Sequence, residues 1–100
     1  MPNERQNTKE KINTRIKEPG QYYVIFHNDD FTPMDLVILI LKHIFMKDND
    51  EAESLMWKVH TEGQAIVGTY NYDIAMTKAA QATNFARQQG YPLRITIKSK

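Results

Sequence analysis

The chain has 100 residues, a hydrophobic content of 41% and a formal net charge of +1, which suits one domain with a single core. Its balanced charge gives no concentrated basic face, so a nucleic-acid partner is not expected. The absence of cysteine excludes disulfides and thiolate metal sites. The longest apolar run, Leu36 to Leu41, is far shorter than the roughly 20 residues of a membrane span. We therefore expect a soluble, cytoplasmic protein without a membrane partner.

Residues 1–20 carry few sizeable apolar side chains, namely Met1, Ile12 and Ile16, and they end in Pro19-Gly20. So little apolar surface cannot offset the entropy that a segment loses when it becomes ordered. The composition predicts a flexible N-terminal extension over residues 1–20 and one folded domain over residues 21–100.

The folded part opens with a strand followed by a helix. Tyr22 to His27 is rich in β-favouring residues, which predicts a strand. Thr32 suits a helix N-cap and Pro33 suits the first helical position, so a helix is expected to start there and to run to about Met46.

A second helix is expected to begin after an N-cap at Asp48 or Asp50, to run to about Thr61 and to stop at Gly63. The β-favouring residues 64–70 then predict another strand.

The last predicted elements are a helix and a half-solvated strand. Asn71 can cap an alanine-rich helix over about residues 72–89 that ends at Gly90, and apolar and polar residues alternate after Pro92. The order β-α-α-β-α-β predicts a small single α/β (α+β) domain, with a three-stranded antiparallel sheet packed with three helices.

Acceptor-rich side chains mark the candidate site at the first strand-to-helix corner. Asn28, Asp29 and Asp30 offer an amide and two carboxylates, and neutral His60 on the second helix offers a ring nitrogen. These groups suit a small cation with several N–H donors. The apolar side chains of Met34, Met56 and Val59 could frame a hole beside them, and an ammonium that adjoins an apolar group describes the N-terminal residue of a peptide.

Two other function classes fit the same residues. Asp29, Asp30 and His60 could serve a metal-dependent hydrolase, since carboxylates and imidazoles are common metal ligands. An exposed apolar first helix could instead make the domain a protein-docking module that is insensitive to a free N-terminus. No glycine-rich phosphate loop and no serine or cysteine nucleophile motif is present, so no cofactor and no catalytic residue is predicted.

Three motifs follow one another along the chain: Asn28 to Met34, Met56 to His60 and Thr77-Lys78. In this order and spacing they resemble the ClpS family of adaptors, which deliver N-degron substrates to Clp AAA+ unfoldases. The resemblance covers about residues 22–98. It implies an adaptor without enzymatic activity that binds proteins beginning with Leu, Phe, Tyr or Trp. It also implies delivery to the N-terminal domain of a ClpA-type or ClpC-type unfoldase for degradation by ClpP.

The resemblance also implies roles for individual residues. The group that holds the α-amino group and first peptide unit comprises Asn28, Asp29, Asp30 and His60. The pocket for the N-terminal side chain comprises Thr32, Met34, Val37, Met56, Val59 and Leu93, with Met34 as a gate against β-branched residues. The groups that dock on the unfoldase are Asp73 and Lys78.

Two positions depart from the family pattern. His27 stands where many members have an aliphatic residue, which predicts a more polar pocket edge. Met76 stands where relatives carry an acid in the docking helix. The resemblance implies no metal and no cofactor, and a monomer is the simplest expectation for a domain of this size.

Overall fold

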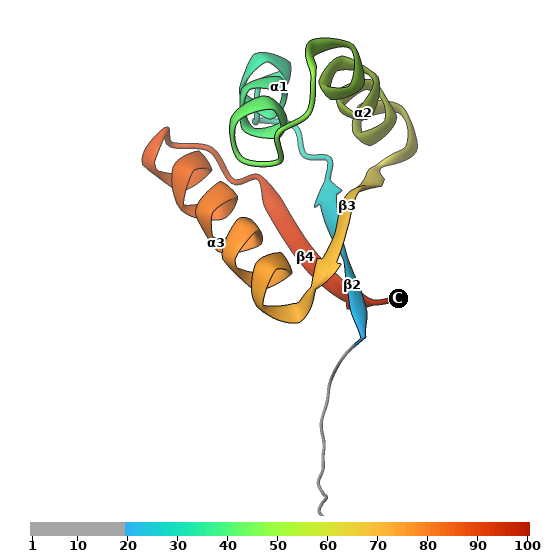
Figure 1. Cartoon of the computed structure of the whole chain (residues 1–100). Coiled ribbons are helices and arrows are strands. Elements are labelled where there is room, and N and C mark those ends of the chain that lie inside the picture. Colours follow the sequence, from blue (N-terminus) through green and yellow to red (C-terminus); the bar gives the residue numbers. More distant parts are fainter. Residues whose placement is uncertain (1–19) are drawn as a thin grey trace, which may run out of the picture.

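The computed structural model describes residues 20–100, which form three helices and three strands (Figure 1). The central strand of the sheet pairs antiparallel with both of its neighbours, in the order β3-β2-β4. The predicted fold class is therefore confirmed. The predicted extension over residues 1–20 lies outside the described residues, apart from Gly20. In chain order, the elements are β2 (Gln21–His27), α1 (Met34–His43), α2 (Asn49–Glu62), β3 (Gln64–Asn71), α3 (Tyr72–Gln88) and β4 (Arg94–Ser99).

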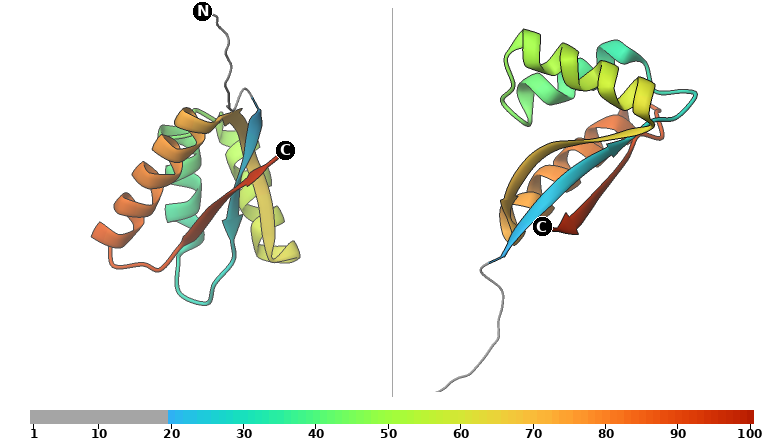
Figure 2. Two further views of the ribbon diagram at one scale, coloured as in Figure 1. Left: turned by 90° about the horizontal axis from the view of Figure 1, so that it is seen from below. Right: turned by 90° about the vertical axis from the view of Figure 1, so that its right-hand side faces the viewer.

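The helices cover the sheet in two places. Helix α3 lies along one face of the sheet, and α1 and α2 lie side by side at the end where β2 finishes (Figures 1 and 2). Ala75, Ala82 and Ala86 of α3 are fully buried, and their small side chains let the helix approach the sheet closely. Val24 and Phe26 of β2 are fully buried in the same core. None of the helices within residues 20–100 is long and apolar enough to cross a membrane.

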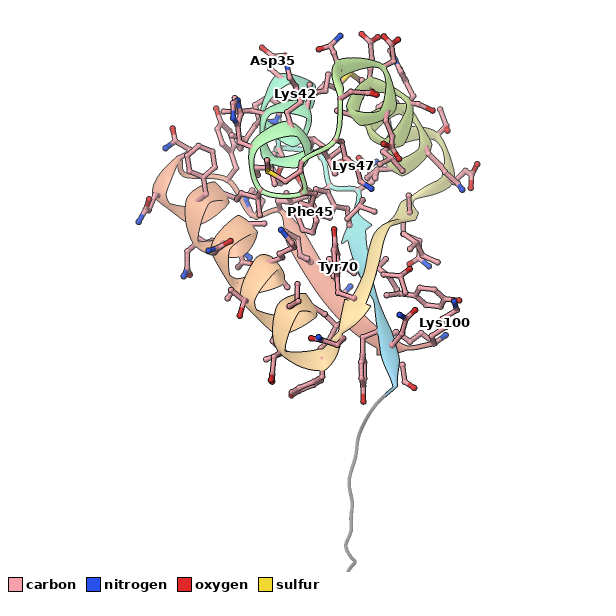
Figure 3. The ribbon with its side chains drawn as sticks, viewed as in Figure 1. Asp35, Lys42, Phe45, Lys47, Tyr70 and Lys100 are labelled. Atoms are coloured by element: carbon pink, nitrogen blue, oxygen red, sulfur yellow. The ribbon has the colours of Figure 1, made fainter. Side chains whose placement is uncertain are left out.

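The β2–β3 pairing contains an irregularity in its register. Val24 faces Gly68 whereas Ile25 faces Ile66, so one extra residue of β3 bulges out of the ladder. A Cβ atom at Gly68 would lie 2.5 Å from the ring of Tyr70, which shows that this ring lies directly over the glycine. A side chain at Gly68 would displace Tyr70 from the region between α3 and the α1–α2 pair (Figure 3).

The ends of α2 and α3 follow the expected local rules. Asp48 caps α2 by accepting the N–H of Glu51 at 2.8 Å, and Gly63 ends it in the left-handed conformation with φ 87°. Asn71 caps α3 by accepting the N–H of Ile74 at 3.0 Å. These predicted caps are confirmed.

Both predicted ends of α1 are wrong. The N-cap is Pro33, without a side-chain cap, because the Thr32 hydroxyl donates instead to Asp29 at 2.8 Å. The helix ends at His43 rather than near Met46. Phe45 turns into the core, where its ring meets that of Phe26 edge-on at a centroid distance of 5.4 Å, and Met46 adopts a φ of 57°. Burial of this ring outweighs continuation of the helix.

Candidate functional site

A cleft of about 430 Å³ lies between the β2–α1 loop, the start of α1 and the second half of α2. We call it the loop pocket. It brings together nine of the twelve site residues expected from sequence, and Phe31 and Pro33 contribute to it as well. Its position follows from the topology, because the end of β2 and the end of α2 are joined by the N–H of Asn28, which donates to the carbonyl of Gly63 at 2.9 Å. The lining residues are Asn28, Asp29, Asp30, Phe31, Thr32, Pro33, Met34, Val37, Met56, Val59 and His60.

Asp29 holds the loop in shape. One carboxylate oxygen accepts the backbone N–H groups of Phe31 at 2.8 Å and Thr32 at 2.7 Å, and the other accepts the Thr32 hydroxyl at 2.8 Å. Burial by itself raises the pKa of Asp29, but these three donors and the charge of Arg87 outweigh it, so that the pKa lies below its ordinary value of 3.8. Most of the acceptor capacity of Asp29 is therefore used within the loop.

We expect Asp29→Asn to lower the free energy of unfolding by about 1 kcal/mol at pH 7, since an amide can replace only part of this hydrogen bonding. The lowered pKa of the folded state makes this stabilisation fully present above pH 3.8, and it is lost as the pH falls through the lower folded value. Urea denaturation at pH 7 and at pH 3 should show the gap between wild type and variant closing in acid. Glu53→Gln, an exposed acid on α2, is the control. A gap that stays constant or widens in acid would contradict this role.

Three polar side chains surround the mouth of the loop pocket. Asn28, Asp30 and His60 are all exposed, and within residues 20–100 the side chains of Asp30 and His60 make no hydrogen bond or ion pair. The His60 ring meets the Trp57 ring edge-on at a centroid distance of 5.7 Å, an arrangement that aromatic pairs favour. The mouth thus offers acceptors and one full negative charge to a ligand.

The interior of the loop pocket is apolar. Val37, Met56 and Val59 are buried, with exposed fractions of 6%, 5% and 3%, so their positions are fixed by the core behind them. Met34 at the start of α1 is 36% exposed and lies at the rim. An apolar floor below a negative, acceptor-rich mouth is complementary to an ammonium group attached to a hydrophobic side chain.

Two residues that were linked to the pocket lie elsewhere. Leu93 is 1% exposed in the core and does not line the loop pocket. His27 does not line it either, and the expected polar edge is absent because its Nε2 lies 2.8 Å from the Thr96 hydroxyl on β4. Burial lowers the pKa of His27, and the nearby charge of Arg94 adds to this effect.

The two expected docking residues do not form one cluster. Asp73 is exposed in the first turn of α3, whereas the Lys78 ammonium donates to the carbonyl of Ile44 at 2.8 Å and lies 5.9 Å and 5.6 Å from the ring centroids of Phe45 and Tyr70. Five positions along a helix correspond to about 140° around its axis, so the two side chains leave α3 in different directions. Lys78 thereby connects α3 with the end of α1 in the region marked by Phe45 and Tyr70 (Figure 3).

Sequence reasoning missed two lining residues, Phe31 and Pro33. Both stand inside the polar motif, but nothing in their spacing distinguished a lining residue from a turn residue. Phe31 could have been recognised from its position in the sequence. It is a large aromatic residue between Asp30 and Thr32, and no periodic core pattern surrounds it.

The structure does not support a metal site at the loop pocket. No three histidine, aspartate or glutamate side chains among residues 20–100 come together in a way that could hold a metal ion. Asp29, one of the three ligands that a hydrolase would need, is already hydrogen-bonded within the loop. The metal-dependent alternative therefore lacks its ligand set in the described part of the chain.

Comparison with known proteins agrees with this geometry. The family described as "ATP-dependent Clp protease adaptor protein ClpS" matches residues 17–96. The ClpS adapter protein of Vibrio atlanticus is 49% identical over 88 residues, which cover 88% of this chain and 83% of that protein. The ClpS of Nitrosomonas eutropha is 46% identical over 91 residues, 91% of this chain and 88% of its own length. The solved structure of Agrobacterium tumefaciens ClpS2 bound to L-phenylalaninamide aligns with a TM-score of 0.80 and 36% identity, covering 83% of this chain and all of that one. This chain therefore belongs to the ClpS family, whose members are adaptor proteins of the ATP-dependent Clp protease rather than enzymes.

Proposed function

We propose that the loop pocket binds the N-terminal residue of proteins that begin with Leu, Phe, Tyr or Trp, and that the chain delivers these N-degron substrates to a Clp AAA+ unfoldase for degradation by ClpP. The observation that carries the proposal is the joining of an apolar cavity to a negatively charged mouth. The similar ClpS2 of Agrobacterium tumefaciens binds L-phenylalaninamide, a phenylalanine with a free amino group.

The chemistry of the mouth matches an α-amino group. A free α-amino group has a pKa of about 7.7–8.0, so it is mostly charged at neutral pH. Asp30 supplies a compensating charge, and Asn28 and His60 supply acceptors for the N–H donors. Asp29 acts chiefly by holding the loop.

The floor of the pocket selects the side chain. Burying a Phe or Leu side chain contributes roughly 1.5–3 kcal/mol. Val37, Met56 and Val59 are held by the core and cannot move far, whereas Met34 at the rim can adjust its shape. In this proposal Met34 narrows the entrance against β-branched residues. Leu93 would contribute as a buried core residue rather than as a lining side chain.

The unfoldase would dock on α3. We propose that exposed Asp73 contacts the N-terminal domain of the unfoldase, of the ClpA or ClpC type. Lys78 retains two further N–H donors beyond the one given to Ile44, so it can serve the partner while it holds α1 in place. The adaptor domain would be residues 21–100, acting as a cytoplasmic monomer.

Four labelled peptides that differ only at their start test the proposal. They begin with Phe, Leu, Ala and acetyl-Phe, and fluorescence anisotropy reports their binding. We expect tight binding of the Phe and Leu peptides, and a loss of roughly tenfold or more for the other two, because Ala leaves the floor empty and acetylation removes the charge. If all four bind alike, the domain is a docking module without N-terminal specificity. If none binds, the proposed pocket function fails.

A further inference from the structure

A second hollow, of about 590 Å³, lies beside the loop pocket. Its lining residues are Phe31, Arg87, Gly90, Tyr91 and Pro92. Phe31 lines both cavities, so the two adjoin at this aromatic side chain. We call this cavity the flanking hollow.

The wall formed by the α3–β4 connection is held firmly. The Arg87 guanidinium donates to the carbonyls of Tyr91 at 3.1 Å and Leu93 at 2.8 Å, and the N–H of Tyr91 donates to the carbonyl of Ala86 at 2.9 Å. Gly90 takes a φ of 88°, which few other residues adopt, and so makes this tight turn possible. The Tyr91 and Pro92 side chains are therefore presented at defined positions.

Phe31 lines the flanking hollow from the β2–α1 loop and is 73% exposed. Its backbone N–H is bound by Asp29 at 2.8 Å, so the loop that carries it is ordered although its ring faces solvent. A large aromatic ring that is held in water beside a binding cleft is a common feature of a recognition surface. No acidic side chain lines the flanking hollow, and Arg87 is its one charged lining residue within residues 20–100.

We propose that the flanking hollow is a subsite for an aromatic side chain at the third position of the bound substrate. The inference rests on the proposed function of the loop pocket. In an extended peptide the first and third side chains point to the same side, roughly 6.6 Å apart. With the first side chain in the loop pocket, the third can pass over Phe31 and lie between its ring, Tyr91 and Pro92. Arg87 can then face the aromatic ring as a cation.

Three peptides that all begin with Phe test this subsite: Phe-Ala-Phe, Phe-Phe-Ala and Phe-Ala-Ala, followed by the same labelled tail. We expect the wild-type protein to bind Phe-Ala-Phe roughly three- to tenfold more tightly than Phe-Ala-Ala. In Phe31→Ala and in Tyr91→Ala the ratio of these two dissociation constants should fall towards one. Met46→Ala, which removes a side chain that is 76% exposed and lines neither cavity, should retain the wild-type ratio.

The ratio separates the subsite from general effects on binding or folding. A variant that weakens both peptides equally does not change it, and far-UV circular dichroism verifies that each variant is folded. A ratio near one in the wild type, an unchanged ratio in both wall variants, or a gain confined to Phe-Phe-Ala would overturn the inference. Failure of Phe-Ala-Ala itself to bind would instead overturn the proposed function of the loop pocket.

Discussion

His60→Ala is expected to weaken the binding of a Phe-initiated peptide by roughly 5- to 150-fold, because one N–H of the bound ammonium would lose its acceptor. The side chain stands at the mouth of the loop pocket, where its ring approaches the exposed Trp57 ring edge-on and makes no hydrogen bond or ion pair within residues 20–100. Its removal should therefore change the free energy of unfolding by no more than about 0.5 kcal/mol. Anisotropy of a labelled peptide and urea denaturation measure the two quantities.

His43→Ala is the matched control for this variant. His43 is likewise an exposed histidine near the end of a helix, but it does not line the loop pocket. Binding should be unchanged in this control. Equal affinities in wild type and His60→Ala would show that His60 does not belong to the site. Equal losses of affinity in both histidine variants would indicate a general effect of removing a histidine side chain from these helices rather than a lost acceptor.

Phe26→Ala is expected to lower the free energy of unfolding by about 3–5 kcal/mol, the largest stability effect of any variant considered. The ring is fully buried on the central strand and meets Phe45 edge-on at 5.4 Å. Phe45 follows α1, so the cavity left by Phe26 would loosen the contact that ends this helix. Since a small domain is stabilised by only about 5–15 kcal/mol, the variant should be close to unfolding at 37 °C.

Phe31→Ala removes the same atoms from the surface and serves as the control for Phe26→Ala. Phe31 is 73% exposed, so its loss should change stability by less than about 0.5 kcal/mol. Urea or thermal denaturation followed by circular dichroism gives both values. A similar loss in the free energy of unfolding for the two variants would mean that Phe31 makes more stabilising contacts than its exposure indicates. A small loss for Phe26→Ala would mean that neighbouring core side chains move to fill the cavity.

Phe26→Ala and His60→Ala together distinguish residues that support the loop pocket from residues that contact the ligand. Val37, Met56 and Val59 face the loop pocket with one side and the core with the other. Weakening the core at Phe26 should therefore lower peptide affinity indirectly, in proportion to the population that unfolds. His60→Ala should lower the peptide affinity without lowering the free energy of unfolding. Measuring both quantities therefore distinguishes a residue that supports the pocket from one that contacts the ligand.

Some elements have ends that depend on local chemistry, and these ends could be predicted from the amino-acid sequence. Asp48, Gly63 and Asn71 act through the nearest turn of their own helix, so their roles could be inferred from residue type and position. The alternation of apolar residues and the order of strands and helices were likewise sufficient for the three-stranded sheet. The polar motif and the distant Met56 to His60 segment indicated the loop pocket, because their resemblance to one family supplied the spatial link between them.

Other features depend on contacts between segments that are distant in the sequence, and these could not be predicted. The end of α1 was missed because Phe45 gains more by packing on Phe26 than by continuing a helix, and Lys78 takes the Ile44 carbonyl from 34 residues away. Asp29 is a local exception: it lines the loop pocket, and the sequence did not show that it also accepts hydrogen bonds from Phe31 and Thr32 of its own loop. A sequence shows which groups are present, but competition for one acceptor or one space in the core is settled by three-dimensional distance.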